Sequence, residues 1–315
     1  MCLAALALDQ NRRFPLVIAG NRDEFFDRAA ARLAWWRPEE TGPEILGGRD
    51  LTAGGTWLGL TLQGRLGLVT NVRDPRRNDP HAPSRGDIIP LWLRSGQPLD
   101  RFWPRVSMSG YNGFNLIAAD FAQGECFWIS NTGEPPKRLG KGIYGLSNAQ
   151  IDTPWPKVQR LKSRMAEAIQ AFDEVDDLAD DLFDALADRM PAPDEQLPHT
   201  GVGLEWERAL SPAFIRTADG RYGTRCSTLV IAERANKRLV THVFERSFSP
   251  QTGMALLRRV SLKNWPPRHT LTSVPGEPPA PADASESGPI SEESQDELAI
   301  KRPRARGVLK PLKVR

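Results

Sequence analysis

The sequence has few cysteines and histidines, the residues that build disulfide frameworks and zinc sites, and it has no long apolar run. Its three cysteines, Cys2, Cys126 and Cys226, are an odd set without CxxC spacing, and its four histidines are scattered. This pattern argues against a structural zinc site and favours a reducing compartment. No apolar run reaches the ~18 to 20 residues of a membrane span, and Leu3 to Leu8 is too short for a signal peptide. We therefore expect a soluble, cytoplasmic protein without integral membrane contact.

Strong charge bias is also absent. The net charge of +3 is small and points to no particular partner, and GxxxxGK[ST] does not occur. We expect no metal, no cofactor and no nucleic-acid partner, and the sequence leaves the oligomeric state open. With 315 residues, 40% hydrophobic and 26% charged, the chain is long enough to bury a large core.

What the chain does have is a cysteine directly behind Met1. If Met1 is removed, which a small second residue permits, Cys2 carries an α-amine and a thiol on one residue. Their reference pKa values, about 7.7 to 8.0 and about 8.5, allow one group to pass a proton to the other near neutrality. Cys2 is thus a candidate nucleophile with its own base. The alternative is a small buried hydrophobe at the start of a strand, because free cysteine is often buried.

A polar tetrad follows the second apolar run of the chain. The runs at residues 3–8 and 14–19 are separated by turn residues, which predicts a hairpin. The tetrad Asn21-Arg22-Asp23-Glu24 then leaves the second strand at the point where it returns to the first residue of the chain. An Asp there would bind the α-ammonium, and an Arg or Asn would orient the thiolate. The alternative is a solvated strand end followed by a turn.

Apolar periodicity predicts strands, a helical middle and further strands. Helices are predicted over residues 88–93 and 99–106, after Pro156, and around residues 178–190. Strands are predicted over residues 3–8, 14–19, 56–61, 66–72, 114–119, 125–130, 228–232 and 239–244. The glycine pairs Gly47-Gly48 and Gly54-Gly55 are expected in tight turns, and Cys126, Cys226 and His242 are expected to be structural.

Six motifs occur in order along the chain. They are Met1-Cys2, Asn21-Arg22-Asp23-Glu24, Gly54-Gly55-Thr56-Trp57-Leu58-Gly59, Tyr111-Asn112-Gly113-Phe114-Asn115-Leu116, Tyr144-Gly145-Leu146-Ser147-Asn148 and Tyr222-Gly223-Thr224-Arg225. On these motifs the chain resembles the NRDE family, also called the transport and Golgi organisation protein 2 family. The resemblance implies an α+β fold like that of N-terminal nucleophile (Ntn) hydrolases. That fold is a four-layer αββα sandwich with two antiparallel sheets.

The resemblance also implies roles for individual residues. Expected catalytic residues are Cys2 as nucleophile, Asp23 as the carboxylate for its amine, Asn71 and Asn148 as oxyanion donors, and Arg225 near the nucleophile. Expected binding or supporting residues are Asn21, Arg22, Glu24 and Trp57. Each asparagine is alternatively a turn residue. Related Ntn hydrolases show Arg-Asn-x-Asp where this chain has Gly20-Asn21-Arg22-Asp23. Gly20 therefore occupies the arginine's place, and Arg22 does not transfer as the catalytic arginine.

Two function classes remain open. In the first, the protein is an N-terminal-cysteine hydrolase that cleaves an amide or thioester bond of a small or acyl-chain metabolite. In the second, the same pocket binds or transfers a hydrophobic metabolite, such as haem, acyl-CoA or a lipid, without catalysis. Fold does not decide between them, because the chemistry belongs to the site.

The domain boundary is expected near residue 262. We expect one Ntn-hydrolase-like domain over residues 1–262 and a disordered tail, rich in Pro, Ser and Glu, over residues 263–315. The tail ends in a basic tip that includes Lys301, Arg302, Arg304 and Arg306. Such a tip is either a weak anchor for an anionic surface or a solubilising extension.

Overall fold

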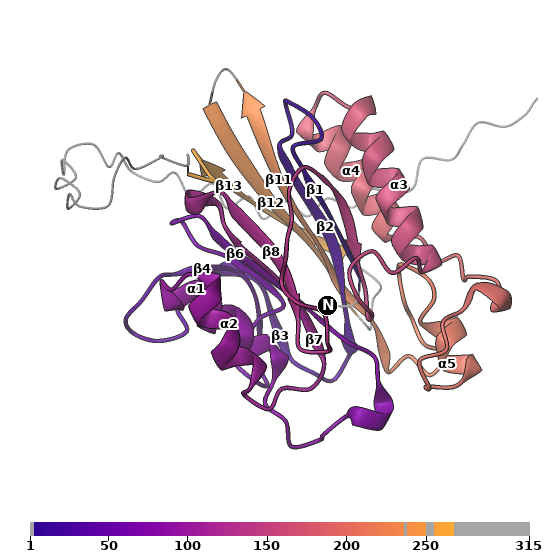
Figure 1. Cartoon of the computed structure of the whole chain (residues 1–315). Helices are drawn as coiled ribbons and strands as arrows, with labels where there is room; N and C mark the ends of the chain where they lie inside the picture. The colour runs from indigo at the N-terminus through magenta and orange to yellow at the C-terminus, as the bar shows by residue number, and fades with distance from the viewer. Residues whose placement is uncertain (1–2, 236–237, 250–254, 268–315) are drawn as a thin grey trace, which may run out of the picture.

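Two antiparallel sheets lie face to face in the structure, a computed structural model that describes residues 3–235, 238–249 and 255–267 (Figure 1). Sheet A has six strands in the order β10-β1-β2-β11-β12-β13, and sheet B has seven in the order β3-β4-β5-β6-β7-β8-β9. Most neighbouring strands in each sheet are consecutive in the sequence. In sheet A two pairs are not, because β10 pairs with β1 and β11 pairs with β2.

The elements have the following bounds. Sheet A contains β1 (Leu3–Leu8), β2 (Leu16–Phe25), β10 (Gly142–Leu146), β11 (Tyr222–Ala235), β12 (Arg238–Phe248) and β13 (Ala255–Lys263). Sheet B contains β3 (Ala30–Trp36), β4 (Ile45–Asp50), β5 (Leu58–Leu60), β6 (Arg65–Asn71), β7 (Phe114–Asp120), β8 (Glu125–Ser130) and β9 (Lys137–Arg138). The α-helices are α1 (Ile88–Ser95), α2 (Leu99–Ser107), α3 (Pro156–Ala171), α4 (Val175–Leu186) and α5 (Leu204–Ala209).

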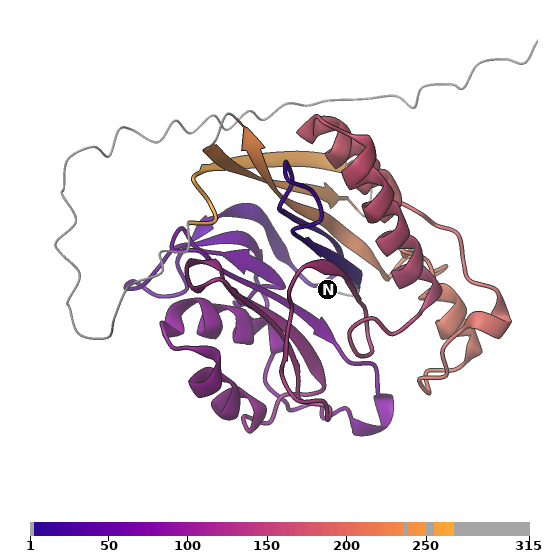
Figure 2. The same ribbon diagram turned by 45° about the horizontal axis from the view of Figure 1, so that its top comes forward.

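Helices cover the outer face of each sheet. Helices α3 and α4 lie on sheet A, and α1 and α2 lie on sheet B (Figure 2). The apolar core accordingly divides into one cluster between the sheets and one under each helix pair. This is the expected αββα sandwich with two antiparallel sheets, and the α+β fold prediction is confirmed.

The sequence patterns explain these layers. In β2, Val17 and Ala19 pack under the helices while Leu16 and Ile18 face the other sheet, because side chains alternate along a strand. Both faces of β2 are buried, so its first half is a continuous apolar run. The predicted helical periodicity is confirmed in α3 and α4, whose buried residues recur three and four positions apart.

The tetrad differs from the expectation that it leaves the strand. Strand β2 continues through the tetrad to Phe25, because β11 pairs with it along its whole length, from Ala232 opposite Leu16 to Tyr222 opposite Phe25. The backbone of the tetrad stays extended because β11 pairs with it on one side and because the tetrad side chains have polar partners on both faces of the sheet. The polar residues therefore belong to the sheet.

The pair Gly47-Gly48 lies in strand β4, which corrects the expected turn. A Cβ on Gly47 would stand 2.5 Å from the carbonyl oxygen of Leu58, and one on Gly48 would stand 2.2 Å from the ring of Trp57. Glycine is needed at these positions because β5 and an indole pack directly against the β4 backbone. Gly54, in contrast, has a φ of +84° and does lie in a turn.

The packed unit extends beyond the expected boundary at residue 262. Strand β13 ends at Lys263, and Trp265 is 2% exposed in the core between the sheets. The indole N–H of Trp265 donates to the carbonyl of Thr61 at 2.8 Å, which ties the chain to sheet B. Residues 268–315, including the predicted basic tip, lie outside the described residues. Among the helices that are described, none has the length and apolar character to cross a bilayer.

Candidate active site

The tetrad places its residues alternately on the two faces of β2. Asn21 and Asp23 face the helix layer of sheet A. The Asn21 amide donates to the carbonyls of Leu186 and Ala213 at 2.9 and 2.8 Å, and its oxygen accepts from the Ser227 hydroxyl at 2.6 Å. Through these three hydrogen bonds the Asn21 side chain joins β2 to Ser227 of β11, to the end of α4 at Leu186 and to the segment that contains Ala213.

Asp23 lies two residues further along the same face. It is 3% exposed, and its Oδ1 accepts from the hydroxyl of Thr224 at 2.7 Å. The Thr224 hydroxyl also accepts from the backbone N–H of Ile215, and the Thr224 N–H donates to the Ile215 carbonyl. The carboxylate is thus held in a fixed position by the strand that follows the helix layer.

Arg22 and Glu24 face the opposite way, towards sheet B. Arg22 is 3% exposed, and its Nη2 lies 3.0 Å from Oδ2 of Asp50. Its guanidinium lies 4.5 Å from the ring centre of Trp57, where a desolvated cation is stabilised by the π face. Glu24 lies 3.8 Å from Arg22 and 3.8 Å from Arg28. Arg22 and Glu24 therefore connect sheet A with sheet B.

Asp50 is the centre of that connection. Burial opposes its ionisation, but hydrogen bonds from Arg28 and from the N–H of Ala53 lower the pKa of the carboxyl below its usual value. Asp50 stays charged between the two guanidinium groups of Arg22 and Arg28. Arg22 Nη1 is buried and has no hydrogen-bond partner among the described residues.

A cavity of about 340 Å³ opens where β6 ends and β11 begins. The polar residues of its lining include Asn71 and Asn148, the two residues expected to donate to an oxyanion, together with Arg73, Asp74, Asn78 and Arg85. The apolar residues of the lining include Val72, Val202, Leu210 and Ile215. The volume lies at the lower end of the ~300 to 1,000 Å³ typical of small-molecule sites. The two asparagines come from different sheets, and the fold brings them to one cavity.

The two amides are bound differently. The Asn148 side chain donates to the carbonyl of Asn71 at 3.0 Å, and its oxygen accepts from Arg73 at 3.2 Å. The backbone N–H of Arg73 also donates to the Asn148 carbonyl at 2.8 Å. The Asn71 side-chain amide has no hydrogen-bond partner within the part of the chain that the structure describes. Of the two, Asn71 is the amide with both N–H groups available to a ligand.

Arg73 and Glu207 were not found by sequence reasoning. Glu207 is 3% exposed, and its carboxylate lies 2.7 Å from Arg73 and accepts from the N–H and hydroxyl of Thr200. The ion pair fixes α5 and the segment before it against the cavity. A signal existed for Arg73, which follows Asn71 by two residues, but none existed for Glu207, whose helix has only six residues.

The cavity is connected to Asp23 and to the start of β1. Ile215 lines the cavity, and its backbone is bonded to Thr224, whose hydroxyl binds Asp23. Strand β1 begins at Leu3 opposite Asn21, and Ala4 pairs with Leu146, two residues before Asn148. The chain therefore enters the fold at the end of sheet A that holds the cavity. Cys2 itself lies outside the described residues.

Arg225 and Trp57 lie away from the cavity lining. Arg225 occupies the bulge between Thr224 and Cys226, and its Nη1 donates to the carbonyls of Phe25 and Arg28 at 2.7 and 2.8 Å. Burial lowers the pKa of its guanidinium, and the nearby charge of Arg22 adds to this effect. Arg225 holds the loop after β2, and Trp57 supports Arg22 in the core between the sheets.

The described thiols are buried in the core. Burial raises the pKa of Cys126 to about 12 and also raises the pKa of Cys226. Both side chains are neutral at physiological pH, as core thiols are. Among the described side chains, no group of three or more His, Cys, Asp or Glu residues is arranged to hold a metal ion.

A family model described as "Transport and Golgi organisation 2" matches residues 1–250. The chain belongs to this family. The sequence resemblance is thereby confirmed, and the match ends before β13, the last strand of sheet A. The mouse protein named "Transport and Golgi organization 2 homolog" is 33% identical over 252 residues, which cover 74% of this chain and 89% of the mouse protein.

This member of the Transport and Golgi organisation 2 family is also similar to solved hydrolase structures. A Caenorhabditis elegans N-acylethanolamine-hydrolyzing acid amidase ortholog has 12% sequence identity and a TM-score of 0.40, covering 73% of this chain and 92% of that one. A variant of conjugated bile acid hydrolase from Clostridium perfringens has 9% identity and a TM-score of 0.42, covering 84% of this chain and 92% of that one.

Proposed function

We propose that the protein is an N-terminal-cysteine hydrolase that cleaves an amide or thioester bond of a small or acyl-chain metabolite. One observation carries the proposal. The cavity that contains Asn71 and Asn148 opens at the end of sheet A where β1 begins, one residue after Cys2. Leu3, the residue that follows Cys2 in the sequence, is the first residue of β1, and its position at this end of sheet A supports the proposal.

The reaction uses the two groups of Cys2 after Met1 is removed. The α-amine takes the thiol proton, and the thiolate sulfur attacks the carbonyl carbon of the substrate. The ammonium then returns the proton to the leaving amine or thiol as the carbon–nitrogen or carbon–sulfur bond breaks, which leaves an acyl-enzyme. A water molecule, deprotonated by the same amine, releases the acid and restores the thiol. In this proposal the Asp23 carboxylate stabilises the ammonium form.

The charge that develops on the carbonyl oxygen needs a neutral donor. Asn71 suits this role, because its amide has no hydrogen-bond partner among the described residues and lines the cavity. Asn148 is bound to Arg73 and to the Asn71 carbonyl, so one of its two N–H groups is already used. We assign Asn71 as the principal oxyanion donor and Asn148 as the residue that positions it.

The experiment combines intact mass with covalent labelling. The mature full-length protein is expected to lack Met1, and an electrophilic acyl probe is expected to label Cys2. Cys2→Ala should abolish the label, and Asp23→Asn should reduce it. Cys126→Ala is the matched control, because that thiol is buried with a raised pKa, and it should leave labelling unchanged. Retention of Met1, or equal labelling in Cys2→Ala, would overturn the hydrolase proposal.

A non-catalytic binding role remains the second candidate. It is favoured by Gly20, which stands where related hydrolases have an arginine, and by the engagement of Asn148 with Arg73. In this case a hydrophobic metabolite occupies the same cavity and Cys2 contacts it. Extraction of a ligand in near-stoichiometric amount, together with unchanged ligand binding in Cys2→Ser, would favour binding over hydrolysis.

A further inference from the structure

The guanidinium of Arg73 lies between a carboxylate and an amide at the cavity wall. Its Nη1 donates to Oε2 of Glu207 at 2.7 Å, and its Nη2 donates to Oδ1 of Asn148 at 3.2 Å. The guanidinium carbon also lies 5.2 Å from the ring centre of Trp155, the residue that precedes α3. Contacts from three separate segments of the chain therefore fix the position of this side chain.

The bond from Arg73 decides which end of the Asn148 amide faces which neighbour. Asn148 is 6% exposed, and its Nδ2 donates to the carbonyl of Asn71 at 3.0 Å while its Oδ1 accepts from Arg73. Rotation of the amide by half a turn would place its oxygen against the Asn71 carbonyl and its N–H groups against the guanidinium. Acceptor would meet acceptor and donor would meet donor, which is unfavourable for a buried group. Arg73 therefore selects one orientation of the Asn148 amide.

Asn148 in turn holds the backbone at the end of β6. The N–H of Arg73 donates to the Asn148 carbonyl at 2.8 Å, and the N–H of Val72 donates to the carbonyl of Gly113 at 2.9 Å. Asn148 thus binds the chain on both sides of Val72, through the Asn71 carbonyl and the Arg73 N–H. The Asn71 side chain, which lines the cavity, is carried by the segment that these bonds fix.

Glu207 compensates the charge of Arg73. The two side chains are 4% and 12% exposed, respectively. The second carboxylate oxygen of Glu207 accepts from the N–H and the hydroxyl of Thr200 at 2.8 and 2.6 Å, so both oxygens have donors. Removal of one ion alone would leave the other buried without its partner, which is strongly destabilising. Glu207 therefore allows a buried cation to stand beside the neutral amide of Asn148.

We propose that Arg73 is a positioning residue for the reaction, which orients the Asn148 amide and through it the Asn71 donor, and that Glu207 acts through Arg73. This inference rests on the proposed function and adds two residues to its machinery. Neither residue contacts the reacting atoms. Because Glu207 belongs to α5, the two amides are correctly placed only while α5 is docked at the cavity.

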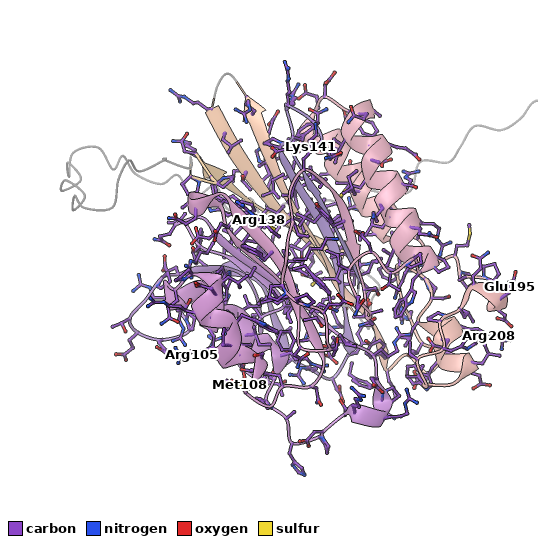
Figure 3. All side chains as sticks on the ribbon, viewed as in Figure 1. Arg105, Met108, Arg138, Lys141, Glu195 and Arg208 are labelled. Carbon is purple, nitrogen blue, oxygen red and sulfur yellow. The ribbon has the colours of Figure 1, made fainter. Side chains whose placement is uncertain are left out.

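The test uses a paired variant, Arg73→Met with Glu207→Gln, which removes both charges together and leaves neither ion stranded. The matched control, Arg208→Met with Asp194→Asn, removes another ion pair of α5, in which Arg208 Nε lies 2.7 Å from Asp194 Oδ1. The Arg208 side chain is 49% exposed and lies at the outer margin of the molecule (Figure 3).

A third variant keeps the ion pair with Glu207. Arg73→Lys retains the cation but replaces the two-armed guanidinium with a single ammonium. Its effect on both readouts below should lie between those of the native protein and the paired variant. Thermal melts establish that the variants are folded, and Arg73→Lys decides the test if the paired variant is not.

The first readout does not use Cys2. In full-length Cys2→Ala protein labelled with ¹⁵N-asparagine, solvent exchange of the Asn148 side-chain amide is measured, and the signal is assigned by its loss in Asn148→Ala. The paired variant should raise this exchange rate by about tenfold or more, because the amide loses the donor that fixes it. The control should leave the rate unchanged. An unchanged rate in the paired variant would overturn the proposal.

The second readout is the labelling of native Cys2 by the acyl probe. The paired variant should lower the maximal rate by about 10-fold to 100-fold and change the half-saturating probe concentration by less than about twofold, because displaced donors weaken the chemical step rather than binding. A purely structural role would lower stability and leave the maximal rate unchanged. The control should change neither kinetic quantity.

A mutant cycle shows whether Arg73 acts through Asn148. In an Asn148→Ala background the paired variant should cause no further loss of labelling rate, because the amide that Arg73 orients is absent. A further loss as large as in the native background would contradict the proposed route.

The two readouts separate this inference from the proposed function. If Cys2 takes no label in the native protein, the hydrolase proposal fails, while amide exchange in the Cys2→Ala protein still decides whether Arg73 orients Asn148. If the paired variant takes label at the native rate, the positioning role is wrong and the hydrolase proposal stands.

Discussion

The two faces of β2 use neighbouring tetrad residues for different purposes. On the helix side, Asn21 binds backbone carbonyls and Asp23 is held close to the cavity wall. On the side between the sheets, Arg22 and Glu24 pair with charged residues and Trp57. One face places groups near the candidate site, and the other fastens the two sheets together. A four-residue motif can therefore be required for two physical reasons, and a loss of function on mutation does not by itself identify a catalytic residue.

The largest effect is expected at Arg22. Arg22→Ala removes a buried cation from Asp50 and Trp57 and leaves Arg28 as the one cation paired with the Asp50 carboxylate among the described residues, so we expect a loss of about 3 to 5 kcal/mol in the free energy of unfolding. Chemical denaturation measures it. Arg28→Ala is the matched control, because its side chain is 31% exposed and pairs with the same carboxylate. A loss at Arg22 no greater than at Arg28 would contradict a structural role for this face.

At Asn71 we expect a large effect on the labelling rate and almost none on stability, the reverse of Arg22. Asn71→Ala should lower the rate of acyl-probe labelling by about 10² to 10³, the usual effect of removing one oxyanion donor. Its stability should change by less than about 0.5 kcal/mol, because the side chain makes no hydrogen bond in the described part of the chain. Asn78→Ala, an exposed amide on the same cavity, is the control and should change neither quantity. Equal effects on labelling from the two variants would remove Asn71 from the mechanism.

Asn21 tests whether the helix-side face is also structural. Asn21→Ala leaves the carbonyls of Leu186 and Ala213 and the hydroxyl of Ser227 without their partner, which should cost about 1 to 3 kcal/mol in unfolding free energy. Ser227→Ala removes one of these three bonds and should cost less. If Asn21→Ala instead keeps full stability and loses acyl labelling, Asn21 belongs with the catalytic residues.

The smallest effect is expected at Glu245, which lies between the sheets near Trp57. Burial raises the pKa of its carboxyl, and its Oε2 has no hydrogen-bond partner among the described residues. Since the folded pKa is above the unfolded value of about 4.3, the contribution to stability is complete below about pH 4 and is lost as the pH rises through the folded pKa.

Glu245→Gln removes this pH-dependent loss. The variant should melt a few degrees higher than the native protein at neutral pH, and the difference should vanish below about pH 4. Thermal melts across this pH range measure it. If the difference in melting temperature between the variant and the native protein is the same at every pH, ionisation of Glu245 does not destabilise the folded protein, and this prediction is wrong.

The predictable parts of this fold are those with strong local patterns. The hairpin of β1 and β2 follows from two apolar runs separated by turn residues, and the helices α3 and α4 follow from apolar periodicity. The short strands β4 and β10 were not predicted, because their extended form depends on neighbours. Gly47 and Gly48 have no side chains to show a period, and only the backbone of Leu58 and the ring of Trp57 require their place in a strand.

The candidate site shows the same division. The sequence by itself determined the residue types, the order of the motifs and thereby the family, because these are properties of the chain. The tertiary structure decided which residues meet. Asn71 and Asn148 share a cavity because β6 and β10 of different sheets end at one place, and Arg225 turns to backbone carbonyls because a bulge redirects it. Glu207 reaches Arg73 across 134 positions of sequence, a distance that no local pattern encodes.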